Sequence, residues 1–416
     1  MAALKRSRHL LAALCAGGFA AACATAPNPY YDASRKHHRP EGFQDNYIEF
    51  QPKNFFVDVL LRWQLPSWFK GLPPAPGVAP PVAAPDLAFI RANGIPGAAP
   101  PASARMQPAA TFIGHATVLV QVPTAAGGLN VLTDPVFGER ASPVSFAGPK
   151  RFQPPGVALG DLPRIDLVLI SHNHYDHLDE DSVKALNAQA GGPPLFVVPL
   201  GIVPWLAQRG IVNAVELDWW DSLALPPSAG SGAPPRAQDV RIERNGAGIA
   251  GGAAGDATQV FLTPAQHWSA RGLGDRLKTL WGGFAVLSPK LHVFYSGDTG
   301  YSQDFADIHA RFAPRQTAAL GGGFDLALLP VGAYEPRWFM QDQHVNPDES
   351  VRIHRDLGAK RSLGVHWGTF SLTDEALDQP PKDLAIARKA QGLADADFFT
   401  LAIGETRRLP ERSVTP

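Results

Sequence analysis

Ser171-His172-Asn173-His174-Tyr175-Asp176-His177 directly follows Ile165–Ile170, a continuous apolar run of the kind that forms a buried strand. Packing alone does not explain three imidazoles and a carboxylate within six residues. Each histidine disfavours protonation of its neighbours, and dehydrated rings without partners cost free energy. A bound metal ion removes both costs, so this turn is predicted to hold metal.

The spacing inside the turn suits two metal ions. In an extended turn His172 and His174 share one face and can bind the first ion, while Asp176 and His177 can reach the second. Further ligands must come from elsewhere in the chain, because zinc hydrolases use several protein ligands and keep one position open for water.

Three more polar residues follow apolar runs and are candidates for these ligands, namely His267, Asp298 and His366. Residues that follow strands lie at the rim of a layered α/β fold, where active sites form. Taken alone, a histidine after a strand is more often a core residue. Together with the turn at 172–177, the three support one shared site.

From residue 111 onward, short apolar runs closed by turn residues alternate with helical patterns, which predicts a layered αββα or α/β architecture. The predicted strands are Thr117–Val122, Asn130–Thr133, Ile165–Ile170, Leu195–Val198, Gln259–Leu262, Gly283–Leu287, His292–Tyr295, Asp325–Leu329, Ser362–Val365 and Phe398–Ala402. The predicted helices are Glu180–Ala190, Pro204–Arg209, Asp304–Phe312, Pro347–Leu357 and Pro381–Gln391.

The first 23 residues have the pattern of an export signal. A basic stretch at 5–8 precedes the apolar segment Leu10–Ala22, which is too short to span a membrane comfortably. Ala20-Ala21-Ala22-Cys23 resembles a bacterial lipobox, which would place a lipid on Cys23; cleavage at an Ala-x-Ala site without acylation is the alternative. Since Cys15 is the one other cysteine, a disulfide framework or thiolate metal site in the folded body is excluded.

The rest of the chain divides into an arm and a folded domain. Residues 24–110 form an irregular arm rich in proline and alanine, in which Phe55–Trp63 is expected to be a short helix packed on the body. Residues 111–410 are expected to form the domain, with a loose surface insertion at 225–258. The net charge of -1 offers no basic surface, so no nucleic-acid partner is expected.

Longer strings resemble a known family. The residues at 172–177, followed by His267, Asp298 and His366, resemble the metallo-β-lactamase superfamily in its two-metal form, which has a four-layer αββα fold. Over residues 111–409 the chain resembles the N-acylphosphatidylethanolamine-hydrolysing phospholipases D within that superfamily. The strings that carry this second resemblance are Gly114–Thr117, Leu132–Pro135, Arg140–Pro143, Gly148–Phe152, Glu216–Trp220, Gly332–Met340, Gln343–Val345 and His366–Phe370.

The resemblance implies two Zn²⁺ ions per chain. It assigns His172, His174 and His267 to one ion and Asp176, His177 and His366 to the other, with Asp298 between them. Two zinc ions about 3.5–4 Å apart lower the pKa of bound water and stabilise both oxygens of a displacement at phosphorus. A carboxylate between the ions offsets their mutual repulsion.

Other residues in the matched strings are expected to support the chemistry. By resemblance His344 contacts the substrate phosphate or assists the leaving group, and with Asp298 and Asp176 it completes the expected catalytic set. The alternative is that His344 only supports a ligand or caps a helix. His115 and Asp134 are expected to orient ligands, because a metal-bound histidine needs a partner for its second ring nitrogen.

A cluster of aromatic and basic residues could line an acyl or phosphate pocket, although aromatic residues at this density are as often core. Its members are Tyr334, Arg337, Trp338 and Phe339. The histidines outside the matched strings, among them His37 and His38, are assigned no function.

The resemblance implies a zinc-dependent phosphodiesterase of phospholipase D type that hydrolyses N-acylphosphatidylethanolamine or a related phospholipid to phosphatidic acid and N-acylethanolamine. The alternative keeps the metals but hydrolyses a lactone, carboxylic ester or lactam, since one fold hosts many reactions. A third hypothesis is an envelope protein whose metal site only stabilises the fold. It requires closed sites, whereas seven ligands for two ions leave open positions.

The expected partner is therefore a phospholipid at a membrane surface, and the resemblance allows a homodimer. The signal predicts a location in a bacterial cell envelope, either anchored by lipid in the outer membrane or free in the periplasm.

Overall fold

The computed structural model describes residues 27–49, 51, 53–94, 106–246, 257–272 and 274–413. The predicted export signal at 1–23 lies outside the described residues. Within them, no helix combines the length and the hydrophobicity that a bilayer crossing needs.

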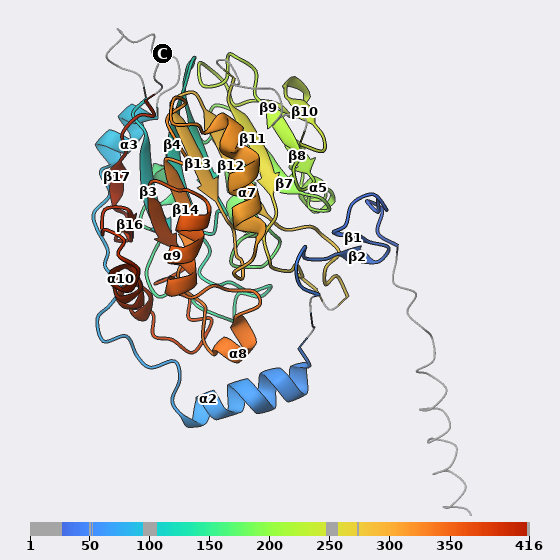
Figure 1. The fold of residues 1–416 in the computed structure, drawn as a ribbon, viewed down its shortest axis with the longest axis vertical. Coiled ribbons are helices and arrows are strands. Elements are labelled where there is room, and N and C mark those ends of the chain that lie inside the picture. The colour runs from blue at the N-terminus through green and yellow to red at the C-terminus, as the bar shows by residue number, and fades with distance from the viewer. Residues whose placement is uncertain are drawn as a thin grey trace, which may run out of the picture.

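Two mixed β-sheets pack face to face at the centre of the molecule (Figure 1). The first contains, in spatial order, β17 (Thr406–Arg408), β3 (Ala109–Gly114), β4 (Thr117–Thr124), β5 (Gly127–Thr133), β6 (Leu167–Leu169), β7 (Leu195–Pro199) and β8 (Ala214–Leu217). The second contains β10 (Arg241–Glu243), β9 (Ser222–Ala224), β11 (Gln259–Thr263), β12 (Gly283–Ser288), β13 (Leu291–Tyr295), β14 (Leu326–Pro330), β15 (Ser362–Val365) and β16 (Phe398–Phe399).

Each sheet has a parallel half. Strands β5 to β8 are parallel in the first sheet, and β13 to β16 are parallel in the second, while the remaining pairs are antiparallel. The carboxyl ends of parallel strands share one edge of their sheet. Loops that leave these strands therefore gather at one end of each parallel half.

Helices cover the outer faces of both sheets. The first sheet is covered by α3 (Leu87–Asn93), α4 (Glu180–Asn187) and α5 (Val203–Ala207), and the second by α7 (Asp304–Phe312), α9 (Pro347–Asp356) and α10 (Gln379–Gln391) (Figure 1). In β4 the side chains alternate: Val118 and Val120 join the core between the sheets, and Leu119 joins the core under the helices. The predicted four-layer αββα fold is confirmed.

Most predicted elements are present with shifts of a few residues. Asp304–Phe312 and Ser362–Val365 have the predicted bounds, whereas β16 is shorter than the strand predicted at Phe398–Ala402. Strands β3 and β17, which pair with each other, were not predicted. Strand β3 is six residues long and fully buried, whereas β17 has only three residues and is held by its pairing with β3 rather than by an apolar pattern of its own.

The segment 225–258 is less loose than expected where it is described. Leu225 and Ala229 belong to the core between the sheets, and β10 extends the second sheet by pairing with β9. The Thr124 hydroxyl donates to the Ala229 carbonyl over 3.0 Å. Short 3₁₀ turns occur at Leu159–Asp161, Ala237–Asp239 and Ala313–Arg315.

The arm also carries more structure than an extended linker. It contains β1 (His38–Arg39), β2 (Gly42–Phe43), the π-helical turn η1 (Phe55–Gln64), α2 (Leu65–Phe69) and α3. Ile90 of α3 is fully buried under the first sheet. The helix formed by η1 and α2 differs from the expectation, because most of its large apolar side chains face solvent.

A buried cluster of side chains fastens the arm to the domain. The Asp218 carboxylate accepts hydrogen bonds from His37 Nε2 over 2.6 Å and from His38 Nε2 over 3.0 Å. The His38 Nδ1 atom accepts from the Asp32 backbone amide over 3.1 Å, so Nε2 carries the proton of the neutral ring. A protonated Nε2 does not bind metal, so this triad is a hydrogen-bonded clamp.

We predict that Asp218→Ala lowers the free energy of unfolding by about 3 kcal/mol, because it leaves two buried imidazoles without their acceptor. Urea unfolding measures this change. Asp239→Ala, at an exposed carboxylate, serves as the control and should change stability by less than about 0.5 kcal/mol. Equal stability of the two variants would contradict the assigned clamp.

Candidate metal centre

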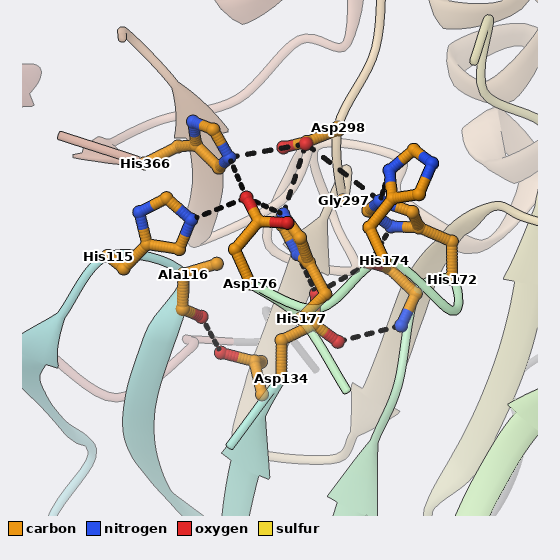
Figure 2. A network of polar contacts seen from close by, with 12 residues as sticks. His115, Ala116, Asp134, His172, His174, Asp176, His177, Gly297, Asp298 and His366 are labelled. Atoms are coloured by element: carbon orange, nitrogen blue, oxygen red, sulfur yellow. Dashed lines mark hydrogen bonds and ion pairs between the residues drawn. The ribbon is translucent and has the colours of Figure 1, made fainter. Parts of the chain in front are cut away.

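The predicted ligands converge where loops leave the strands of both sheets (Figure 2). The turn at 172–177 follows β6 of the first sheet, whereas His267, Asp298 and His366 follow β11, β13 and β15 of the second. His366 has a φ of 62°, in the left-handed region that non-glycine residues seldom occupy. This backbone bend directs the chain out of β15 at the centre itself.

Three histidines form the first ligand set. His172 Nε2 lies 2.8 Å from His174 Nδ1, and His174 Nδ1 lies 3.3 Å from His267 Nε2. These atoms are within 4.8 Å of one another, and the three side chains could hold one metal ion. His172 and His267 are buried, and His174 is partly exposed.

The second set combines one carboxylate with imidazoles. Asp176 Oδ2 lies 3.4 Å from both His177 Nε2 and His366 Nε2, and 3.0 Å from His115 Nε2. These four residues could hold a second ion. His177, His366 and His115 are all buried, so these three rings have little contact with bulk water.

One oxygen joins the two sets. Asp298 Oδ2 lies 3.0 Å from His177 Nε2, 3.2 Å from His366 Nε2, and 3.9 Å from both His172 Nε2 and His267 Nε2. A carboxylate in this position can bind two cations at once and offset their repulsion. The structure thus brings together all seven ligands predicted from the sequence.

The protonation pattern of the first set fits a metal. The Ser171 hydroxyl donates to Asp134, so its oxygen accepts from His172 Nδ1–H and leaves His172 Nε2 without a proton. His267 Nδ1 donates to the Gln343 carbonyl over 3.0 Å, which leaves His267 Nε2 unprotonated as well. His174 Nδ1 carries one proton at most, so it can satisfy one of the two unprotonated nitrogens that face it, whereas a cation between the three rings would satisfy all of them.

The second set shows the same need. His177 Nδ1 donates to Asp134 Oδ2 over 2.6 Å. Within the described part of the chain, His177 Nε2 and His366 Nε2 are buried without a hydrogen-bond partner, although both face Asp298. Orphaned nitrogens beside carboxylates are the donor set of a borderline-soft divalent cation. The residues present therefore fit a two-metal centre.

Burial keeps the first set neutral. Desolvation, reinforced by neighbouring histidines, lowers the pKa of His174 to about 3 and that of His267 to about 4. It also lowers the pKa of His172 well below its ordinary value. Neutral imidazole is the form that binds metal, so these side chains need no deprotonation.

Carboxylates have the opposite effect on the second set. Burial alone would lower the pKa of His366, but Asp298 and Asp176 outweigh it and raise the pKa to about 9. The same carboxylates, with Asp134, raise the pKa of His177 well above its usual range against burial. Without metal these two rings hold protons that a cation must displace.

Asp134 and His115 lie where ligand-orienting residues are needed. The Asp134 carboxylate accepts from the Ser171 amide over 2.7 Å, from the Ser171 hydroxyl over 2.6 Å and from the Tyr295 hydroxyl, in addition to His177. His115 Nε2 contacts the Asp176 oxygen that faces the metal position. Asp134 is fully buried, so each contact holds its partner firmly.

Sequence reasoning missed the contribution of the arm to this centre. Asp45 Oδ1 accepts a hydrogen bond from the His267 backbone amide over 3.0 Å, and burial raises the pKa of Asp45 well above its ordinary value. Arg271 was also missed: its guanidinium donates to the carbonyls of Asn173 and Leu178 at either end of the metal turn. Neither residue lies in a pattern that marks it, because the contacts form only in the fold.

His344 borders the centre as predicted from its string. Its Nε2 lies 3.9 Å from Asp298 Oδ2, and its Nδ1 has no hydrogen-bond partner among the described residues. Burial lowers the pKa of His344 well below its usual value, with Asp298 opposing, so the ring is neutral. A neutral ring can donate one hydrogen bond to a ligand between the sets.

The candidate pocket residues lie farther out. The Tyr334 hydroxyl donates to Asp383, and the side chain is 4% exposed, so its hydroxyl is already engaged. Arg337 donates to the His344 carbonyl over 2.8 Å and to Glu349 over 2.8 Å, which makes it a support for the His344 backbone. Trp338, 38% exposed, remains available on α8 (Arg337–Met340), which also contains Phe339.

Comparisons with known proteins agree with this geometry. The model of a β-lactamase superfamily domain matches residues 129–367. The N-acyl-phosphatidylethanolamine-hydrolyzing phospholipase D 1 of Caenorhabditis elegans is 38% identical over 314 residues, 73% of this chain and 76% of that protein. The mitochondrial N-acyl-phosphatidylethanolamine-hydrolyzing phospholipase D of Saccharomyces cerevisiae is 35% identical over 276 residues, 65% of this chain and 51% of the yeast protein.

A solved structure shares the fold. The isothiocyanate hydrolase from Delia radicum gut bacteria superposes with a TM-score of 0.50 at 19% identity, covering 73% of this chain and 99% of that one. At this identity the likeness concerns the fold alone.

We predict that metal binding releases protons and strengthens as the pH rises. Since His366, with a pKa raised to about 9, and His177 are protonated in the metal-free protein, protons compete with the cation at neutral pH. Apparent affinity should rise by up to about tenfold per pH unit for each proton released. Chelator competition from pH 6 to pH 9 measures it, and an affinity independent of pH in that window would refute the assignment.

Proposed function

The chain belongs to the metallo-β-lactamase superfamily and, within it, to the N-acylphosphatidylethanolamine-hydrolysing phospholipase D family, and from this membership we propose that it is a zinc-dependent phosphodiesterase. Its substrate is N-acylphosphatidylethanolamine or a related phospholipid, and its products are phosphatidic acid and N-acylethanolamine. Two Zn²⁺ ions are the proposed cofactors.

The position of Asp298 carries the proposal. One carboxylate oxygen lies between the two ligand sets, within 3.9 Å of each. Two zinc ions held by the two ligand sets and Asp298 would lower the pKa of a bound water and would stabilise the charge of an in-line displacement at phosphorus. This arrangement suits a phosphodiester, whose transition state spreads negative charge over several oxygens.

The side chains around the centre have distinct tasks in this reaction. Asp134 and His115 hold His177 and Asp176 in place, which keeps the second set rigid. His344, neutral and buried beside Asp298, donates a hydrogen bond to a phosphate oxygen or to the departing ethanolamide oxygen. The Arg337 guanidinium donates to the His344 carbonyl and so supports the backbone that carries this ring.

We also propose that the protein resides in a bacterial cell envelope, anchored by a lipid on Cys23 or free in the periplasm. The basic stretch, apolar segment and small-residue exit before Cys23 support this location. Such a protein meets phospholipid at a membrane surface.

We predict that Asp298→Asn abolishes hydrolysis of N-acylphosphatidylethanolamine in zinc-supplied protein, with a loss of at least about 10³-fold. The amide keeps the shape but removes the charge that joins the two ligand sets. Release of N-acylethanolamine measures the rate, and a screen with lactone, ester and lactam substrates runs beside it. Turnover of a lactone with no turnover of any phosphodiester would overturn the proposed reaction.

Two further variants separate chemistry from folding. Asp395→Asn, at a carboxylate that is 88% exposed, should retain full activity. His344→Ala should lower kcat while bound metal stays unchanged, because His344 belongs to neither ligand set. If His344→Ala instead loses metal, His344 is a ligand rather than a substrate contact.

We predict that Cys23→Ser abolishes attachment of a lipid to the protein, because it removes the site of acylation. Radiolabelled palmitate incorporation in growing cells checks the lipid directly. A wild-type chain without label, recovered in the soluble fraction, would show cleavage without acylation.

A further inference from the structure

The helix formed by η1 and α2 directs polar side-chain atoms toward the protein and large apolar side chains toward solvent. Its polar side-chain atoms face the protein: Trp63 Nε1 donates to Asp374 Oδ1 over 3.0 Å, and the Ser67 hydroxyl donates to Asp374 Oδ2 over 2.6 Å. Its large apolar side chains face outward. Their exposed fractions are 49% for Val57, 59% for Leu61, 44% for Leu65, 72% for Trp68 and 75% for Phe69.

This outward face, which we call the apolar face of the helix, is costly in water. Leaving a large apolar side chain exposed forgoes about 1.5–3 kcal/mol of burial for each. Single exposed apolar residues are normal, but a contiguous set on one helix marks a surface that binds something. The Trp68 and Phe69 rings lie together with centroids 5.0 Å apart, so the end of the face is one aromatic cluster.

The helix packs on α8, which precedes His344 in the chain. Figure 1 shows the helix beside α8 at one end of the molecule. The Trp63 ring lies 4.7 Å from the Phe339 ring, and the Arg62 guanidinium lies 4.6 Å from the centre of the Trp338 ring. Arg337 of the same α8 donates to the His344 carbonyl, so one short helix contacts both the amphipathic helix and the backbone of His344.

Charge at the end of the helix favours an anionic partner. Residues 53–70 contain Lys53, Arg62 and Lys70 against the acidic residue Asp58. Lys53 pairs with Asp342 over 3.9 Å, whereas Lys70, next to Phe69, has no ion pair among the described residues. Asp58 accepts from the Asn54 backbone amide and pairs with Arg62 over 2.8 Å, so its charge is compensated within the helix. An amphipathic helix with aromatic and aliphatic residues outward and basic residues at its flanks is the form that lies in the interface of anionic membranes.

A second copy of the chain fits this face less well. In a symmetric dimer the same patch meets itself, and Asp58, which is already paired with Arg62, is the one carboxylate that residues 53–70 could offer to Lys70 of the other copy. Lipid headgroups that carry negative charge have the complementary sign.

We propose that the apolar face of the helix Phe55–Phe69 docks this protein on a bilayer that contains anionic phospholipid, with Leu61, Trp68 and Phe69 inserted at the level of the headgroups and upper acyl chains. This inference deepens the proposed function and rests on it for the nature of the substrate. Docking by this face brings α8, which supports the backbone of His344, to the membrane, where a diacyl substrate resides.

Site-specific fluorescence tests the docking. Cys15→Ser and Cys23→Ser are combined in the full chain, so no acyl chain can hold the protein and a single new cysteine can be labelled. Trp68→Cys and Leu61→Cys then carry a polarity-sensitive dye, and Val212→Cys and Ile386→Cys are matched controls, since Val212 is 80% and Ile386 67% exposed elsewhere. Vesicles contain phosphatidylcholine and phosphatidylglycerol, with and without brominated acyl chains.

The dye at positions 68 and 61 should shift to the blue on vesicle addition and be quenched by brominated lipid, whereas the dye at 212 and 386 should remain in water. A dye at 68 that stays water-exposed while the protein sediments with vesicles overturns the proposal. A blue shift at 68 that depends on protein concentration and needs no vesicles also overturns it, because a second copy then covers the face.

A second measurement does not depend on labelling. In the same cysteine-free chain, Trp68→Ser with Phe69→Ser should lower the vesicle partition coefficient by about tenfold or more, because two exposed aromatic side chains no longer insert. The matched double variant Val212→Ser with Ile386→Ser should partition like the parent. Equal partitioning of the two double variants refutes docking by this face.

These vesicles contain no N-acylated phospholipid, so the outcome is independent of turnover. Insertion at 68 without hydrolysis of any phosphodiester would leave docking intact and remove the proposed reaction. Hydrolysis of N-acylphosphatidylethanolamine without insertion at 68 would leave the reaction intact and remove the docking.

Discussion

The fully buried Asp134 carboxylate is the contact on which the centre depends, because it joins the two sheets. It follows β5 of the first sheet, accepts from Tyr295 of β13 in the second sheet, and holds His177 through a 2.6 Å hydrogen bond. His177 in turn faces Asp298, which follows β13. Ligands from two separate sheets can meet within 4 Å only if the ends of those sheets are fixed to each other, and this carboxylate fixes them.

The balance of charge explains why the centre tolerates so many buried polar groups. Burial keeps the three histidines of the first set neutral, whereas two carboxylates draw His177 and His366 toward protonation. Divalent cations replace those protons and satisfy the orphaned nitrogens together. Both the protonation states of these histidines and the distances between the side chains therefore fit metal binding.

The sequence predicted which side chains gather at this centre because its signals are local. Four predicted ligands lie in one short turn after a buried strand, and each of the others follows a strand of its own. Once the layered fold is predicted, residues that follow its strands are expected at one edge of the sheets. The contacts between the arm and the domain could not be predicted in this way. Asp45 supports His267 across 222 positions, and the pairing of His37 and His38 with Asp218 spans about 180 positions. No periodicity or motif encodes a contact of that range.

The helix at 55–69 shows a second limit of local pattern. The sequence pattern of an amphipathic helix does not show whether its apolar face contacts a protein core or points outward. The orientation depends on which face is bound to the rest of the protein. Here the anchor is Asp374, more than 300 positions away, which binds Trp63 and Ser67 and turns the apolar side chains outward. A lipid phosphodiester joins an apolar body to a charged head, so an enzyme that acts on it from water needs an apolar surface next to a polar centre. In this chain α8 connects the two, with Phe339 against the helix and Arg337 bound to the backbone of His344.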